Sequence, residues 1–382
     1  MAYQNVGTPR FFIDNYQYLR AMGLDPLQYY LNDVTFPNTT EPYVDLGSQW
    51  KTVFDNPNAF TLSPEISKEF VNTSNYQDYM KWLIPMGNNV SGMDFSGNMK
   101  WYCALLNHNL GDVDAELQSI QFRPSFTGED AESDQTDKVT ILNNENGSNF
   151  ENNGTTIIYT ELVPTSSMVY TGIQLKNEAT QIPSVDIGAI SMGVMYTMPN
   201  SPDLDLNMEI EFDGYDKTTT LGGSDLTNIR YTGSPNWTLD GKYITPFGVG
   251  DYYDSTFLGG SKRNGRRTWN LKFSYISDKD LFSSNYMPND YLEIDGNTSN
   301  YDSDDLNTDG NTFEYNMFTD DSFVAQVWNK TCGGALSFIF QPDSNNNQPD
   351  QFAICVLDQD SLTISQKAFK SYEIALKIRE VW

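Results

Sequence analysis

The stretch RTWNLKFSYI at residues 267–276 decides the fold class. Its polar and apolar residues alternate, and the apolar set on one face is Trp269, Leu271, Phe273 and Tyr275. A period of two is typical of a strand with one face buried and the other in solvent. The closing stretch alternates in the same way, with Tyr372, Ile374, Leu376 and Ile378 on the predicted inner face. The C-terminal residues are therefore predicted to pair in a sheet.

Other apolar stretches are shorter and less regular. MKWYCALL at 99–106 is almost continuously apolar, which predicts a strand covered on both faces. TTIIYTELV (155–163), MVYTGIQL (168–175) and IGAISMGVMYTM (187–198) follow at strand-and-turn intervals. This spacing favours a mainly β fold of antiparallel β-sandwich or jelly-roll-like domains.

The length of 382 residues exceeds the usual size of one hydrophobic core, so two domains are expected. Two prolines and two aspartates in MPNSPDLD, at 198–205, mark the boundary. The predicted units are an N-terminal arm over 1–60, a jelly-roll-like sandwich over 61–200 and a second β domain over 201–382. In the arm, Asp14 is expected to cap a short helix, NYQYLRAM, that Gly23 ends.

Two polar stretches interrupt the strand pattern. Residues 128–154 are rich in Asn, Asp and Glu and predict a long exposed loop or hairpin. Residues 283–321 are dense in Asp and Asn and carry no Lys or Arg, which predicts an acidic insertion in the second domain.

The charge balance narrows the choice of partners. Lys and Arg number 23 and Asp and Glu 51, which gives a formal net charge of −28. Nucleic acid and anionic membranes are poor partners for such a chain. No apolar run is long enough to span a membrane and the first residues lack the pattern of a signal peptide, so we expect synthesis in a cytoplasm. Three widely spaced cysteines favour neither a disulfide framework nor a zinc site.

Catalytic signals are weak. His108, in LLNHNLGD, is the only histidine, so a Ser-His-Asp arrangement would depend on it alone. We favour a turn over Asn107, His108 and Asn109, whose side chains would cap backbone groups. With 51 acidic residues, pairs at glycosidase spacing arise by chance. We predict that the protein is not an enzyme and needs no cofactor.

The most specific local motif is half of a calcium-binding loop. Asp305, Asn307 and Asp309 alternate ahead of Gly310, as the oxygen ligands of such a loop do. The second half departs from the pattern, because the twelfth position is Asn316, where a bidentate Glu is required. A solvated acidic loop is the favoured interpretation, and a calcium site is the alternative.

KRNGRR at 262–267 is the one basic cluster. Asn-Gly pairs favour tight hairpin turns, so a solvated turn is the simpler interpretation. Alternatively, Arg263, Arg266 and Arg267 dock against an acidic patch of a neighbouring molecule, since opposite charges steer association.

Several segments together resemble tailed-bacteriophage virion proteins. KWYCALLNHNLGDVDAEL and VDIGAISMGVMYTMP resemble strands of galactose-binding-like jelly rolls in such proteins. GRRTWNLKFSYISDKDLF, FVAQVWNKTCGGALSFIFQPD and SYEIALKIREVW are similar to the ends of tail and baseplate adaptor proteins.

This resemblance implies a structural role in a virion, near the tail or baseplate, with copies of the same chain and other virion proteins as partners. Capsid decoration or a head fibre would use similar β-modules. A carbohydrate-binding module for host attachment, contacting surface glycans through aromatic side chains, is the alternative from another functional class. The resemblance transfers no catalytic or ligand-binding residue.

Overall fold

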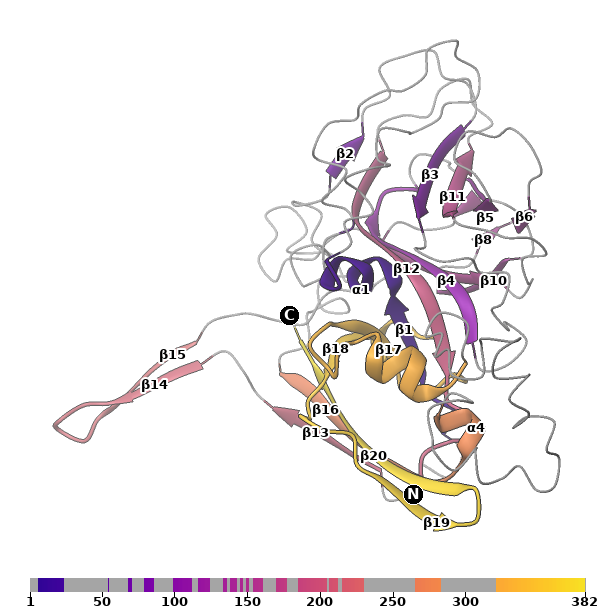
Figure 1. The fold of residues 1–382 in the computed structure, drawn as a ribbon. Helices are drawn as coiled ribbons and strands as arrows, with labels where there is room; N and C mark the ends of the chain where they lie inside the picture. Colours follow the sequence, from indigo (N-terminus) through magenta and orange to yellow (C-terminus); the bar gives the residue numbers. More distant parts are fainter. Residues whose placement is uncertain are drawn as a thin grey trace.

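The computed structural model describes residues 6–23, 54, 68–70, 79–85, 99–111, 116–123, 133–135, 138–142, 145–146, 149–150, 154–160, 170–176, 185–204, 206–211, 215–229, 265–282 and 321–381. Within these ranges the chain is mainly β, and every strand pairing is antiparallel (Figure 1). The predicted fold class is confirmed.

Twelve strands form one large sheet, and ten of them follow the spatial order β13-β16-β20-β18-β17-β1-β12-β4-β10-β7, with β19 paired to β20 and β2 to β12. Their bounds are β1 (Arg10–Asp14), β2 (Lys68–Phe70), β4 (Met99–His108), β7 (Lys138–Leu142), β10 (Gly154–Thr160), β12 (Val185–Thr197), β13 (Asn207–Glu211), β16 (Arg266–Ser277), β17 (Phe338–Gln341), β18 (Ala353–Leu357), β19 (Ile364–Ala368) and β20 (Ser371–Glu380).

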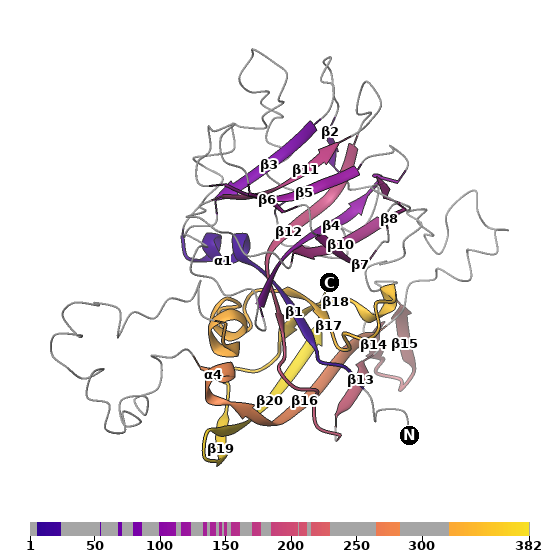
Figure 2. The same ribbon diagram turned by 90° about the vertical axis from the view of Figure 1, so that its right-hand side faces the viewer.

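A six-stranded sheet lies beside the β12–β4–β10 part of the large sheet (Figure 2). It contains β3 (Tyr79–Pro85), β5 (Glu116–Arg123), β6 (Ser133–Gln135), β8 (Glu145–Asn146), β9 (Asn149–Phe150) and β11 (Tyr170–Lys176). A third sheet is the hairpin of β14 (Tyr215–Thr219) and β15 (Asp225–Ile229). The helical elements are α1 (Asn15–Ala21), α4 (Asp278–Leu281), the π-helix η6 (Val324–Asn329) and the 3₁₀ helix η7 (Pro349–Gln351).

The N-terminal strand β1 joins the two halves of the large sheet. It pairs with β12 on one side and with β17 on the other. The arm predicted over 1–60 is therefore wrong for residues 10–14, because this apolar segment fills a central position. The predicted helix is confirmed as α1, where the Asp14 carboxylate accepts hydrogen bonds from the backbone N–H groups of Tyr16 (2.8 Å) and Gln17 (3.1 Å).

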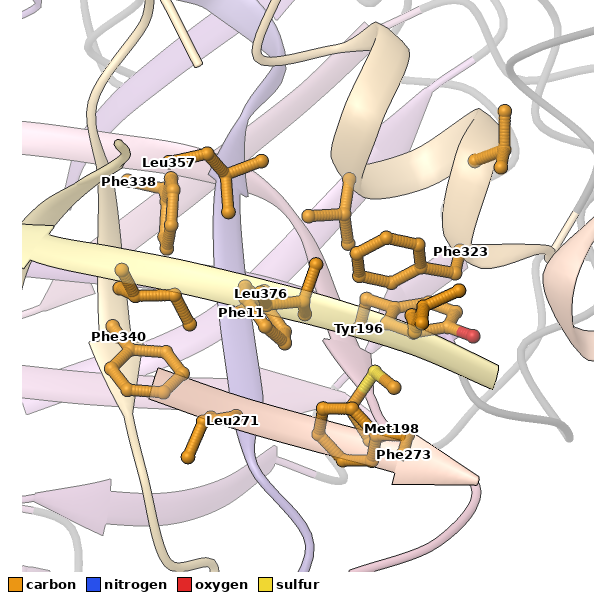
Figure 3. Close-up of a cluster of buried hydrophobic side chains, with 14 of the residues drawn as sticks. Phe11, Tyr196, Met198, Leu271, Phe273, Phe323, Phe338, Phe340, Leu357 and Leu376 are labelled. Atoms are coloured by element: carbon orange, nitrogen blue, oxygen red, sulfur yellow. The ribbon is translucent and has the colours of Figure 1, made fainter. Parts of the chain in front are cut away.

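The alternation of β1 builds a core on each face of the large sheet. Phe11 and Ile13 point into a cluster shared with β16, β17, β18 and β20, while Phe12 points into the cluster on β4, β10 and β12. In the first cluster, shown in Figure 3, the ring of Phe323 lies 5.9 Å from that of Phe11 and 6.0 Å from that of Tyr196. One short strand thus anchors the packing on both faces.

Two strand predictions are confirmed and one is corrected. The 99–106 segment is buried almost throughout as β4, and the inward set of the C-terminal strand is buried in β20. In β16 the alternation fails at Tyr275, which is exposed. The pairing with β20 shifts register between Phe273 and Ile276, so Ile276 takes the inward place. This irregularity, a β-bulge, turns Tyr275 to the solvent.

The polar stretch 128–154 includes a hairpin of β8 and β9, but it is not exposed throughout. It contains β6 to β9, and Ile141 and Leu142 of β7 are buried at the end of the large sheet. The division at about residue 200 stays a prediction, although strands from both predicted domains share one sheet. The insertion predicted over 283–321 lies outside the described residues except for Asp321.

Candidate assembly surface

The first strand in the order of the large sheet, β13, has one open edge within the described part of the chain. It pairs with β16 from Asn207–Asn270 to Glu211–Arg266. All five of its side chains are exposed, whereas four of the five in the central strand β1 are buried. An open edge presents unpaired backbone N–H and C=O groups on which another strand can pair.

The face of β13 that lies on the same side of the sheet as the hydrophobic core carries apolar side chains that are exposed to solvent. Met208 lies opposite the buried Trp269, and Ile210 lies opposite the buried Arg267. Although both face the core side of the sheet, Met208 is 44% exposed and Ile210 is 60% exposed. The neighbouring Leu204 is 76% exposed. Met208 and Ile210 form an apolar strip along β13.

The outer face of the same strand is acidic. Glu209 and Glu211 alternate with the apolar residues and lie on the face opposite them. The Glu211 carboxylate pairs with the Arg379 guanidinium at 3.1 Å, and Glu209 forms no ion pair with a described residue. The edge therefore combines an apolar strip on one face with the charge of Glu209, which no described residue neutralises, on the other.

The β14–β15 hairpin stands away from the body of the protein (Figure 1). Its loop, Leu221–Gly223, is closed by hydrogen bonds from Gly223 N–H to the Thr220 carbonyl (2.9 Å) and from Thr220 N–H to the Ser224 carbonyl (2.8 Å). Gly223 has a φ of +83°, which glycine adopts without strain and which ends three-residue hairpin loops. Leu221 at the tip is fully exposed.

One polar cluster holds the two strands of the hairpin together. Asp225 accepts a hydrogen bond from the Thr219 hydroxyl at 2.7 Å and pairs with the Lys217 ammonium at 2.7 Å. The bond from Lys217, followed by that from Thr219, lowers the pKa of Asp225. Two-stranded hairpins without a core are only marginally stable in water. Contact with another surface would therefore stabilise this hairpin.

Two of the three arginines predicted to form an interface are described, and their surroundings differ. Arg263 lies outside the described residues. Arg266 begins β16 opposite Glu211, and Arg267 is buried. The Arg267 guanidinium pairs with Glu380 at 3.2 Å, donates to the carbonyls of Asp350 (2.7 Å) and Phe352 (3.1 Å), and lies 4.8 Å from the Trp269 ring. The interface role predicted for Arg267 is wrong, because its charge is neutralised inside the protein.

His108 lies inside the protein, at the end of β4. Its Nε2 is 2.7 Å from the Thr156 hydroxyl, and its Nδ1 accepts a hydrogen bond from Leu110 N–H at 3.2 Å. Burial lowers the pKa of His108 to about 3, so the imidazole stays neutral near neutral pH. Asn109 meanwhile accepts from Asp186 N–H at 2.8 Å. Capping of backbone groups is confirmed for His108 and Asn109. The turn predicted over 107–109 is wrong for Asn107 and His108, because β4 continues through both residues.

A second buried polar network lies where β1 crosses β12. The Tyr102 hydroxyl is 2.7 Å from that of Ser191, which hydrogen-bonds to the Asp14 carboxylate. Burial raises the pKa of Asp14 to about 7, although the hydrogen bonds from Gln17, Ser191 and Tyr16 act in the opposite direction. All three side chains are buried, so this network fixes β1 and α1 in place.

Lys330, which follows η6, is fully buried. Its ammonium donates to the Gln326 side-chain oxygen at 2.6 Å, and burial lowers its pKa to about 7. Lys330 and Gln326 both have further interactions, so the lysine is held within a network in the protein interior.

The calcium ligands predicted at Asp305, Asn307 and Asp309 lie outside the described residues. Among the residues that the structure does describe, no group of three or more His, Cys, Asp or Glu side chains could hold a metal ion.

Sequence reasoning did not find β13 or the hairpin. For the hairpin a signal was present, because Gly222–Gly223 between threonine-rich flanks is a turn pattern. For β13 the period of two in NMEIE is clear, yet the sequence does not show whether a neighbour covers its outer edge.

The chain was compared with known families and proteins. No family model, curated protein or solved structure matches it. In the described segments, no helix has the length and apolar character required to cross a membrane.

Proposed function

We propose that this protein is a non-enzymatic structural component of a larger assembly, of the kind that forms the tail or baseplate of a bacteriophage virion. It acts through contacts with copies of itself and with other proteins of the particle. The virion setting is supported by the resemblance of its strand segments to tail and baseplate proteins. In this setting the chain is made in the host cytoplasm and works in the virion.

The observation that carries the assembly role is the projecting β14–β15 hairpin. Its described side chains are exposed except for the half-buried Thr220, and Leu221 stands at its tip, so the hairpin buries little surface within its own chain. An ordered ribbon of this kind loses conformational entropy without the burial that would offset it. Contact with another subunit supplies that burial, as apolar side chains projecting from a surface mark interaction sites.

The test is light scattering coupled to size-exclusion chromatography at low and high salt. Because the chain carries a net charge of −28, salt screens the repulsion between copies, and association of the wild-type chain should rise with salt. Replacing residues 215–229 by a short Gly-Ser linker should abolish this association while the melting temperature of the body is kept. A wild-type chain that stays monomeric at both salt concentrations would contradict self-assembly.

A pair of point variants separates the hairpin from general surface hydrophobicity. Leu221→Ser removes the apolar tip of the β14–β15 hairpin, and Phe369→Ser removes a similarly exposed apolar side chain at the β19–β20 turn. We expect association to weaken only in the Leu221 variant. Equal weakening in both would show that exposed apolar area, and not the hairpin, drives association.

A further inference from the structure

We propose that the open edge of β13 binds an extended segment of a different protein, in which apolar and basic side chains alternate. The segment adds to the large sheet as one more strand. This inference rests on the proposed function, since it assigns a class of partner to part of the assembly surface. Strand addition of this type draws affinity from backbone hydrogen bonds and specificity from alternate side chains.

The backbone of β13 is available for this pairing. Its register with β16 is regular over all five residues, so its other edge presents its N–H and C=O groups at the spacing of a regular ladder. The order of the sheet places no described strand beyond β13. Figure 2 shows β13 at the margin of the sheet, next to β16.

The alternation of apolar and acidic side chains along β13 determines which side chains a partner strand should carry at each position. Residues directly opposite each other in an antiparallel pair share a face of the sheet. A partner strand would therefore place every second side chain beside Met208 and Ile210, on the face that ends in Trp269. Apolar side chains at those positions would cover the exposed apolar strip and extend the core to the edge.

The remaining side chains of the partner would face Glu209 and Glu211. Among the described residues Arg379 pairs with Glu211, and Glu209 has no ionic partner. A Lys or Arg of the bound segment opposite Glu209 would supply one. Opposite charges across two strands stabilise the pair, and like charges destabilise it.

This charge pattern disfavours a second copy as the occupant. Antiparallel self-pairing that uses all five residues of β13 sets Glu209 opposite Glu209 of the other copy. It also joins two chains that each carry a net charge of −28. A basic strand from another protein removes both sources of repulsion.

The experiment measures binding of fluorescent peptides to the full chain by anisotropy. The probe is a short peptide in which valine and lysine alternate. The first control has a proline in place of the central valine, which keeps the charge and removes one backbone donor. The second control alternates valine and glutamate. We expect binding of the lysine probe alone, with slower hydrogen exchange in the amides of residues 207–211.

Two variants with the same change in charge locate the site. Glu209→Lys should weaken binding of the lysine probe on the order of tenfold and permit binding of the glutamate peptide. Asp360→Lys, at an exposed position outside β13, should change affinity much less. Equal loss in both variants, or equal binding of the proline peptide, would show unspecific attraction to an acidic protein and overturn the proposal.

A second result would also overturn the proposal. If the chain associates with itself, this association slows hydrogen exchange in residues 207–211, and the lysine probe does not bind, the occupant of the edge is a second copy. These outcomes are independent of the hairpin. If deletion of residues 215–229 abolishes association and no peptide binds, the proposed function stands and this inference fails. If the lysine probe binds at β13 but the wild-type chain never associates, self-assembly fails and the peptide site stands.

Discussion

The strands β1 and β13 have the same length and belong to the same sheet, but they differ in how many of their edges are paired and in how far their side chains are buried. β1 pairs on both edges, and its side chains fill cores on both faces. β13 pairs on one edge within the described chain, and all its side chains are exposed. The central strand pairs its backbone within the chain on both edges, whereas the outer edge of β13 pairs with no described strand. Substitutions at the two places should differ accordingly.

The largest effect is expected from the buried ion pair that lies between the core and β13. Arg267→Met removes a cation from Glu380, which is fully buried, and should lower the free energy of unfolding by about 3–5 kcal/mol. Urea denaturation measures the change. The matched control is Arg379→Met, which breaks the exposed pair with Glu211 and should cost at most about 1 kcal/mol. Similar losses in both variants would contradict the internal role of Arg267.

A smaller loss is expected where β12 packs against β1. A Cβ atom on Gly193 would overlap the carbonyl oxygen of Ile13 and lie 2.7 Å from the backbone nitrogen of Asn15. Gly193→Ala should therefore force β1 out of register and cost about 2–3 kcal/mol, measured by thermal unfolding. Gly222→Ala, in the hairpin loop, meets only the Thr220 hydroxyl at 4.0 Å and should change stability little. If the two variants unfold alike, β1 is not the tightly packed centre of the sheet.

Sequence patterns predicted where strands lie in the chain better than which strands and side chains pair with each other. Alternation identified β16 and β20, and continuous apolarity identified β4, because these signals lie within one strand. The central place of β1 was missed, since a short apolar run next to a helix cap does not reveal which strands flank it. The Arg267–Glu380 pair joins residues 113 positions apart, and nothing in the sequence KRNGRR distinguishes the buried Arg267 from the other basic residues. The assembly surface was missed for the same reason, because an open edge is a property of the whole sheet.

The buried Asp14 at the end of β1 should make the stability of the protein depend on pH. Burial raises the pKa of Asp14 to about 7 from an ordinary value of 3.8, so the folded protein holds this proton over a range in which the unfolded chain releases it. The stabilisation from protonated Asp14 is complete below about pH 4 and is lost as the pH rises through 7. Asp14→Asn cannot ionise and keeps a side chain that can cap α1. From pH 5 to pH 7 its stability should therefore rise relative to wild type by about 2 kcal/mol.

Glu209→Gln makes the same type of change, carboxylate to amide, on the exposed edge strand and is the comparison variant. The measurement is urea denaturation of the three proteins at several pH values. A flat difference for Asp14→Asn would show that water or a cation reaches this carboxylate, and that the centre of the sheet is less closed than its packing indicates. A stability difference between Asp14→Asn and wild type that changes with pH would support the contrast between the buried central strand β1 and the exposed edge strand β13.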